Sequence, residues 1–86
     1  MDTVFLDTET TGLDDAAQIV EIAIVDEAGV VLFESCCQPT VPVDPGAQAV
    51  HGIGPEKLAT APSWPEIATQ VRAVLESKTV VIFNSN

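Results

Sequence analysis

The feature that most restricts the fold of this chain is an apolar run near its end, Val80-Val81-Ile82-Phe83. Polar and apolar residues do not alternate in the run, so both faces of the strand that it predicts need cover. Such a strand is typical of the interior of a parallel sheet flanked by helices. The sequence ends three residues later, at Asn86. We therefore expect the native domain to continue, and the exposed edge of this strand to invite self-association.

Three more strands are predicted upstream of this run. Residues 3–6 form a short β-prone segment, residues 18–26 form a longer segment rich in β-branched side chains, and residues 30–38 form another longer segment. The two longer segments are separated by Asp26-Glu27-Ala28-Gly29, which has the composition of a tight turn. Strands joined so closely must pair antiparallel, so this part of the chain should form a hairpin.

Between the hairpin and the last strand, the sequence predicts one clear helix. Ser63 and Glu66 have the spacing of a capping box, and the helix should run from Ser63 to about Ser77. Its apolar residues form a single stripe: Ile67, Val71, Val74 and Leu75. Residues 39–45 contain three prolines and should be irregular, and a single helical turn is expected to start at Pro55. A helix that crosses over to a parallel fourth strand makes the fold class α/β, with a mixed sheet.

The charge of the chain is strongly acidic. Its 86 residues contain 13 Asp and Glu against 3 Lys and Arg, a net charge of −10. A protein that holds nucleic acid through its phosphates normally supplies several Lys or Arg. Either this chain does not bind nucleic acid, or divalent cations neutralise the phosphates, or the basic residues lie elsewhere. A solvated acidic surface explains most of the acids under any function.

Other features of the sequence narrow the class of protein. An apolar fraction of 47% is too high for a disordered segment. No apolar run approaches the roughly 18 residues of a membrane span, and the start has no basic region typical of a signal peptide, so we expect a cytoplasmic protein without a membrane partner. Cys36 and Cys37 are too few for a disulfide framework and lack partners for a metal site, so they should be free thiols in a reduced protein.

Two acids, Asp7 and Glu9, stand two residues apart at the end of the first predicted strand. Residues at this spacing point to the same face of a strand, so both carboxylates project into one small volume. Carboxylate oxygens suit Mg²⁺ or Mn²⁺, and two such ions about 3.5–4 Å apart can drive phosphodiester hydrolysis. In a chain this acidic the pair also arises by chance, so a strand end with two solvated acids is the alternative interpretation.

The longer string around this pair, Phe5-Leu6-Asp7-Thr8-Glu9-Thr10-Thr11-Gly12-Leu13, resembles the first motif of the DEDD family of 3′→5′ exonucleases. That family includes the epsilon proofreading subunit of bacterial DNA polymerase III and ribonuclease T. His51-Gly52-Ile53 resembles the family's His-Gly-Ile element, and residues 80–86 resemble the opening of its second motif. The resemblance spans residues 3–86. It implies a ribonuclease H-like sheet truncated after its fourth strand, with residues 1–86 as the N-terminal half of one exonuclease domain.

The resemblance also implies roles for individual residues. Asp7 would bind both metal ions, and Glu9 would bind the ion that activates water. The substrate-binding residues would be those that follow or adjoin these acids, together with one histidine: Thr8, Thr10, Thr11, Gly12, Leu13 and His51. The backbone around Gly12 would hold the 3′-terminal nucleotide, Leu13 would wedge against its base, and His51 would help to place it.

Simpler interpretations exist for several of these residues. His51 can be a loop histidine without a ligand, and Leu13 can be an ordinary core residue. We expect Asn84 to cap or support the site and to take no part in chemistry. The first strand should lie at the centre of the sheet, which would place Asp7 and Glu9 beside the carboxyl end of the fourth strand.

Several parts of the family's active site are absent from this sequence. In the family, an aromatic residue and an Asp, the third metal ligand, follow the position of Asn86, and a later motif supplies a His base and the fourth acid. We therefore expect a nuclease that releases nucleoside 5′-monophosphates from single-stranded 3′ ends, DNA or RNA, of which this 86-residue chain alone is inactive. The alternative is a non-catalytic ribonuclease H-like interaction module, in which the exposed edge and the acidic charge serve association.

Overall fold

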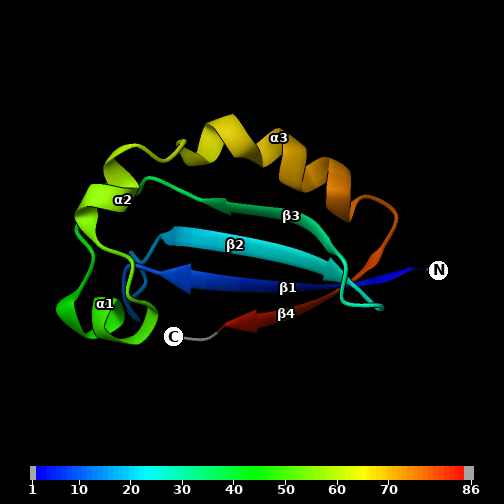
Figure 1. Ribbon diagram of the computed structural model, residues 1–86, viewed down its shortest axis with the longest axis horizontal. Helices are drawn as coiled ribbons and strands as arrows, with labels where there is room; N and C mark the ends of the chain where they lie inside the picture. Colours follow the sequence, from blue (N-terminus) through cyan, green and yellow to red (C-terminus); the bar gives the residue numbers. More distant parts are fainter. Residues whose placement is uncertain (1, 85–86) are drawn as a thin grey trace.

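The structure is a computed structural model that describes residues 2–84, and it has a mixed four-stranded sheet with three helices (Figure 1). The elements in chain order are β1 (Thr3–Thr10), β2 (Ile19–Asp26), β3 (Val31–Cys36), α1 (Pro45–His51), α2 (Pro55–Ala59), α3 (Trp64–Leu75) and β4 (Thr79–Asn84). The predicted α/β class is confirmed.

The strand order in the sheet is β3-β2-β1-β4, so β1 lies in its interior. β2 pairs antiparallel with both β1 and β3, which confirms the predicted hairpin. β4 pairs parallel with β1, and Asp7 is in register with Phe83. The predicted position of the first strand, beside the carboxyl end of the fourth, is therefore confirmed.

The hairpin turn is held by one side chain. Oδ1 of Asp26 accepts hydrogen bonds from the backbone N–H groups of Ala28 (2.8 Å) and Val30 (2.9 Å). Gly29 follows with φ of 82°, a backbone conformation that side chains disfavour. These local bonds satisfy the backbone where the chain reverses and so fix the start of β3.

Helix α3 covers one face of the sheet. It begins after Ser63, whose backbone N–H and side-chain hydroxyl both donate hydrogen bonds to Oε1 of Glu66, at 3.2 and 2.9 Å. Its buried residues, Ile67 and Val71, pack on apolar side chains from the strands: Val4, Leu6, Ile22 and Ile24. The predicted capping pair and apolar stripe therefore set both the start of the helix and the face that it buries.

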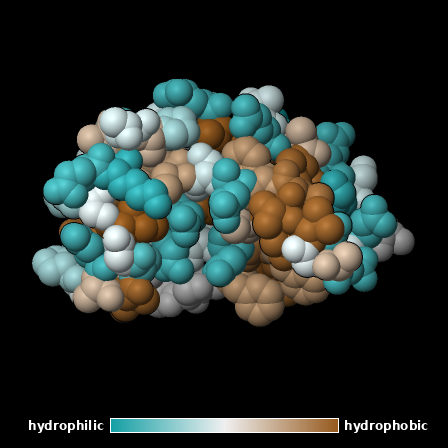
Figure 2. Space-filling view, in the orientation of Figure 1, coloured by the Kyte–Doolittle hydropathy of each residue, from teal (hydrophilic) through white to brown (hydrophobic). Residues whose placement is uncertain are grey.

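The opposite face of the sheet is not covered by any helix between residues 2 and 84, and we call it the open face. Near the start of β1 it carries one apolar residue from each strand in a row across the sheet: Val31, Val25, Phe5 and Val81. The rings of Phe5 and Phe83 stack, with centroids 6.2 Å apart. Figure 2 shows a hydrophobic patch over the half of the molecule where these strands lie.

The outer edge of the sheet is also apolar and exposed. In β4, Ile82 is 68% exposed and Phe83 is 54% exposed, as expected for a strand whose sequence has no polar face. The predicted self-association through this edge has no support from the described residues and stays a prediction. None of the helices between residues 2 and 84 has the length and hydrophobicity that a membrane crossing requires.

Two sequence-based expectations need correction. The first strand does not stop at residue 6 but continues through Thr10, because β2 supplies backbone partners along its whole length. Helix α1 was not predicted, because residues 45–51 lack a side-chain cap and bury no side chain. At the chain end, residues 85 and 86 of the expected second motif lie outside the described residues.

Candidate active site

Asp7 and Glu9 both project from the open face. The side chains that alternate with them, those of Leu6, Thr8 and Thr10, are buried on the side of α3. Asp7 is exposed and Glu9 is half-buried. The register of β1 thus brings the two predicted metal ligands to one face of the sheet.

Glu9 has an unusual environment. Its Oε2 atom is buried from solvent and has no hydrogen-bond partner among residues 2–84. A buried carboxylate oxygen normally has a partner, because it has lost its hydration. A divalent cation shared with Asp7 would supply that partner, so these residues fit the metal ions that the family resemblance implies.

The acidic character of this end of the open face extends across the sheet. Glu21 of β2 lies directly opposite Glu9, and Cys36 of β3 lies opposite Glu21. Within residues 2–84, however, no three metal-ligating side chains come together closely enough to form a complete site. This part of the chain therefore presents two carboxylates with a third acid beside them, and not a complete cation site.

The loop after β1 is held by Thr11, which is almost fully buried. Its backbone N–H donates to the carbonyl of Gln18 (2.9 Å), and its hydroxyl accepts from the N–H of Gln18 (3.0 Å). Its carbonyl accepts from the N–H of Asp44 (2.7 Å). Thr11 therefore joins the start of β2 to the segment that leads into α1.

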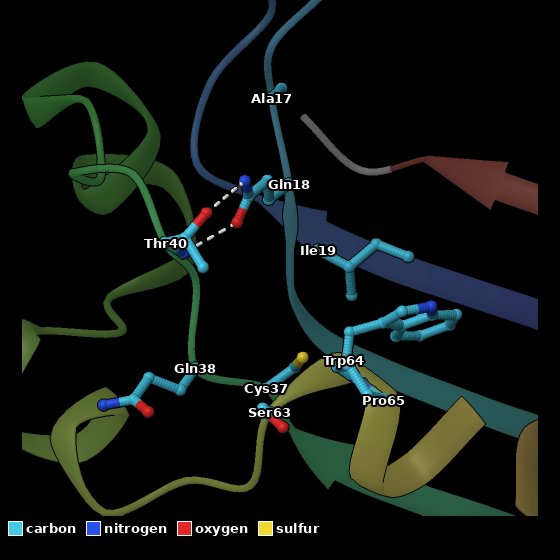
Figure 3. A pocket seen from close by; sticks show the side chains of 9 residues that line it. All are labelled: Ala17, Gln18, Ile19, Cys37, Gln38, Thr40, Ser63, Trp64 and Pro65. Atoms are coloured by element: carbon cyan, nitrogen blue, oxygen red, sulfur yellow. Dashed lines mark hydrogen bonds between the residues drawn. The ribbon is translucent and has the colours of Figure 1, made fainter. Parts of the chain in front are cut away.

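A second connection between the same segments comes from the side chain of Gln18. Its Nε2 donates to Oγ1 of Thr40, and its Oε1 accepts from the backbone N–H of Thr40, both at 2.7 Å (Figure 3). The primary amide thus contacts both the side chain and the backbone of Thr40, once as a donor and once as an acceptor. The loop at residues 11–18 and the segment at residues 38–44 are fixed relative to each other by this pair and by Thr11.

His51 lies at the end of α1, against the end of β1. Its Nδ1 accepts a hydrogen bond from the N–H of Ile53 (3.0 Å), so the ring proton lies on Nε2, which is 3.1 Å from the carbonyl oxygen of Thr10. Both ring nitrogens are therefore engaged inside the chain. His51 holds the His-Gly-Ile turn against the active-site strand, and only its ring faces are free to contact a ligand.

Beside this turn is a hollow of about 300 Å³, which we call the loop pocket. It is lined by residues of the loop after β1 and of α1: Gly12, Leu13, Asp44, Gly46, Ala47 and Val50. Leu13 is 82% exposed and Val50 is 65% exposed. The interpretation of Leu13 as a core residue is therefore wrong, and exposed apolar walls of this kind suit a flat organic ligand.

The other predicted substrate-binding residues divide into two groups. Thr10 and Gly12 belong to the loop itself, where the hydroxyl of Thr10 donates to the carbonyl of Gly12 (2.8 Å). Thr8 is buried on the face of α3, so its side chain points away from the open face, and its substrate-binding role stays a prediction. Sequence patterns gave no signal for Glu21, Gln18 or Asp44, because their positions depend on long-range pairing.

A second hollow, of about 430 Å³, lies on the α3 side of the sheet. In Figure 3 the ring of Trp64 lies beside Ile19, and the thiol of Cys37 points toward these two side chains. Burial, with smaller contributions from Cys36 and Glu66, raises the pKa of the Cys37 thiol. Both cysteines are free, as predicted, and a thiol in this environment is a poor nucleophile.

Few basic residues lie near the acids of the open face. Arg72 is on α3, and Lys78 precedes β4 at the far end of the sheet, where its Nζ donates to the carbonyl of Val74 (2.6 Å). Only Lys57, on α2, lies at the end of the sheet where β1 finishes (Figure 1). The chain itself therefore offers almost no positive charge to a phosphate at this site.

Comparison with known proteins agrees with this geometry. The RNase_T model, described as exonuclease, matches residues 4–86. An uncharacterized exonuclease, CP81, of Escherichia phage 186 is 41% identical over 85 residues, which cover 99% of this chain and 44% of that protein. DNA polymerase III subunit epsilon of Escherichia coli is 33% identical over 92 residues, covering 95% of this chain and 38% of that one.

A solved structure gives the same result for the fold. Exonuclease X in complex with 5′ overhanging duplex DNA aligns with a TM-score of 0.68 and 32% identity, over 80% of this chain and 42% of that one. The sheet, the open face and the acid pair thus define a nuclease-class domain of the ribonuclease H-like fold. The chain belongs to the RNase_T exonuclease family. It spans less than half the length of the relatives described here.

Proposed function

We propose that this chain supplies the first metal-binding strand and the nucleotide-binding loop of a metal-dependent 3′→5′ exonuclease. The observation that carries the proposal is the partnerless buried oxygen of Glu9, on the same strand face as Asp7, in a chain of the exonuclease family. The substrate is a single-stranded 3′ end, and the products are nucleoside 5′-monophosphates. Residues 1–86 act as the N-terminal half of one domain.

The acidity of the chain favours a role for metal ions. With so few basic side chains near the site, a phosphate could approach Asp7 and Glu9 only if cations neutralised their charge. Asp7 and Glu9 would hold Mg²⁺ or Mn²⁺. When bound, such ions activate water and stabilise the charge that develops on a phosphodiester.

The residues of the chain itself then bind and orient the substrate. Leu13 and Val50 flank the terminal base in the loop pocket, and the backbone around Gly12 approaches the sugar. His51 fixes the end of β1 through Thr10, so that the acids and the pocket keep one relative position. Because two carboxylates form an incomplete site, the 86-residue chain by itself is inactive.

Metal binding can be tested on the intact chain by thermal unfolding. Adding Mn²⁺ or Mg²⁺ at matched ionic strength should raise the melting temperature, since a ligand at ten times its Kd adds about 1.4 kcal/mol to the free energy of unfolding. Asp7→Asn and Glu9→Gln should abolish the increase. Glu34→Gln, an exposed acid opposite Ala23 on the open face, is the matched control and should keep it. An equal increase in all four proteins would contradict a specific site.

Polarity and activity need a complete domain. A chimera in which this chain replaces the matching N-terminal part of the Escherichia coli epsilon subunit should release mononucleotides from the 3′ end of a labelled single strand when Mg²⁺ is present. The same chimera with Asp7→Ala should be inactive. Degradation from the 5′ end, or activity of the isolated chain, would overturn the proposal.

A second candidate function uses the same fold without catalysis. The apolar row on the open face and the exposed β4 edge favour a module that associates with another protein. The two functions differ in their need for metal ions. If Asp7→Asn and Glu9→Gln changed neither metal stabilisation nor the activity of the chimera, the interaction module would be the better description.

A further inference from the structure

The walls of the loop pocket are almost entirely apolar or backbone. Leu13, Ala47 and Val50 provide hydrocarbon, and Gly12 and Gly46 provide backbone. Asp44 is the one lining residue whose side chain has hydrogen-bonding atoms. If the pocket holds the terminal base, as in the proposed function on which this inference rests, the carboxylate of Asp44 is the side chain placed to distinguish one base from another.

Asp44 does not use its side chain in the way that its position in the sequence suggests. It is the N-cap residue of α1, where an Asp side chain normally accepts a hydrogen bond from the first turn, yet it makes no capping hydrogen bond. Its carboxylate instead lies against Gly12. A Cβ atom at residue 12 would overlap with Oδ2 of Asp44, so a larger residue there would push the carboxylate away from its present position.

The chemistry of a carboxylate makes a clear distinction among bases. A carboxylate offers acceptors and no donors. Cytosine, adenine and guanine each carry an exocyclic amino group that donates hydrogen bonds, whereas thymine and uracil present carbonyl oxygens in its place. An amino group beside Asp44 would form a charge-assisted hydrogen bond, but a carbonyl oxygen would be repelled.

We propose that Asp44 is a specificity-determining residue, which makes the pocket favour a 3′-terminal nucleotide whose base carries an exocyclic amino group over thymine or uracil. Gly12 is the matching feature, because the absence of its Cβ allows the carboxylate to stand in the pocket. Asp44 takes no part in the bond-breaking step.

Nucleosides test this inference without metal ions or phosphates. Cytidine and uridine differ at position 4, where one has an amino group and the other an oxygen; guanosine and inosine differ by the amino group at position 2. Each would be titrated into the ¹⁵N-labelled chain while the amide signals of Gly12, Leu13 and Val50 are followed by NMR. We expect cytidine to bind roughly fivefold more tightly than uridine. Guanosine should bind more tightly than inosine by a similar factor.

Substitutions then test whether Asp44 causes the preference for cytidine over uridine. Asp44→Asn should bring the cytidine-to-uridine ratio close to one, because an amide offers a donor as well as an acceptor. Asn is as good an N-cap as Asp, so the helix should be kept, and an unchanged amide spectrum outside the pocket would verify this. Asp15→Asn, an exposed loop acid outside the pocket lining, is the charge-matched control and should keep the ratio.

The outcomes separate this inference from the proposed function. Equal binding of all four nucleosides, or a preference that survives Asp44→Asn, would overturn the role of Asp44 and leave the pocket as a base-binding site. If no nucleoside shifted the signals of the pocket, both the inference and the assignment of the pocket to the base would fail. The stabilisation of the fold by metal ions bound at Asp7 and Glu9 would still be tested separately, by thermal unfolding.

Discussion

Glu9 of β1 lies directly opposite Glu21 of β2, and both side chains project from the face of the sheet that α3 leaves uncovered. Residues in such a pair have Cβ atoms about 4.5–5.5 Å apart, and like charges at this distance are destabilising. The pair continues the regular register that begins with Val4 opposite Asp26, and the register shifts only beyond it, between Glu9 and Thr10. The sheet thus holds two carboxylates together at the place where a cation would be used.

The first prediction concerns the charge of Glu21. Without divalent ions, Glu21→Gln should raise the free energy of unfolding by about 0.2–1 kcal/mol, because it removes the repulsion from Glu9. With saturating Mn²⁺ this gain in the free energy of unfolding should shrink or reverse, because the variant has one acid fewer and attracts the ion less strongly than wild type does. Urea denaturation with EDTA and with Mn²⁺ measures both values. Glu34→Gln, opposite Ala23, is the control, and an equal gain there would indicate a general charge effect.

The second prediction concerns the pair formed by Gln18 and Thr40. Gln18→Ala removes two hydrogen bonds and should lower the free energy of unfolding by about 1–2 kcal/mol, whereas Thr40→Val removes only one and should lower it less. The amide of Thr40 should also exchange its hydrogen faster in Gln18→Ala. Gln70→Ala, an exposed glutamine of α3, is the control. Unchanged exchange at Thr40 would show that the two segments are held by Thr11 alone.

The third prediction is a pH dependence at the start of α3. Backbone and side-chain hydrogen bonds from Ser63, in that order, lower the pKa of Glu66 below its ordinary value of 4.5. A carboxyl whose pKa is lowered on folding stabilises the fold above that value, and the contribution is lost as the pH falls through the lowered pKa. Wild type should therefore unfold at a higher temperature than Glu66→Gln at pH 7, and the difference should shrink at pH 3. A difference of equal size at both pH values would contradict this account.

The fourth prediction compares two isoleucines of the sheet. Ile24 is completely buried under α3, and Ile24→Ala should lower the free energy of unfolding by about 2–5 kcal/mol. Ile82 is 68% exposed, and Ile82→Ala should change it by less than about 1 kcal/mol. Chemical denaturation of both variants measures the two effects. A large loss at Ile82 would mean that the β4 edge is covered in solution.

Local signals in the sequence predicted most of the fold. The hairpin follows from its turn residues, α3 from its capping box and stripe, and β4 from its apolar run, and all three are confirmed. Each signal lies within a few residues, where propensity and periodicity act. Helix α1 gave no such signal, because it buries no residue and its N-cap side chain turns to Gly12 instead.

The candidate site was predictable only along β1. The spacing of Asp7 and Glu9 fixes their common face, and the same alternation places Thr8 on the other. The remaining contacts join distant parts of the chain. The register shift next to the Glu9–Glu21 pair leaves Val20 without an opposite residue in β1, and Val20 packs in a separate apolar cluster with Ile53. No pattern in the sequence reports where such a shift will fall.

The open face has a consequence for the control of the chemistry. On β1 the apolar contact surface at Phe5 and the proposed metal ligand Asp7 are separated by a single residue, and Asp7 is in register with Phe83. Anything that shields the hydrophobic row from water must therefore lie directly beside the two carboxylates, within reach of any ion that they hold. Under the proposed function, covering the hydrophobic row and completing the metal site would therefore depend on each other.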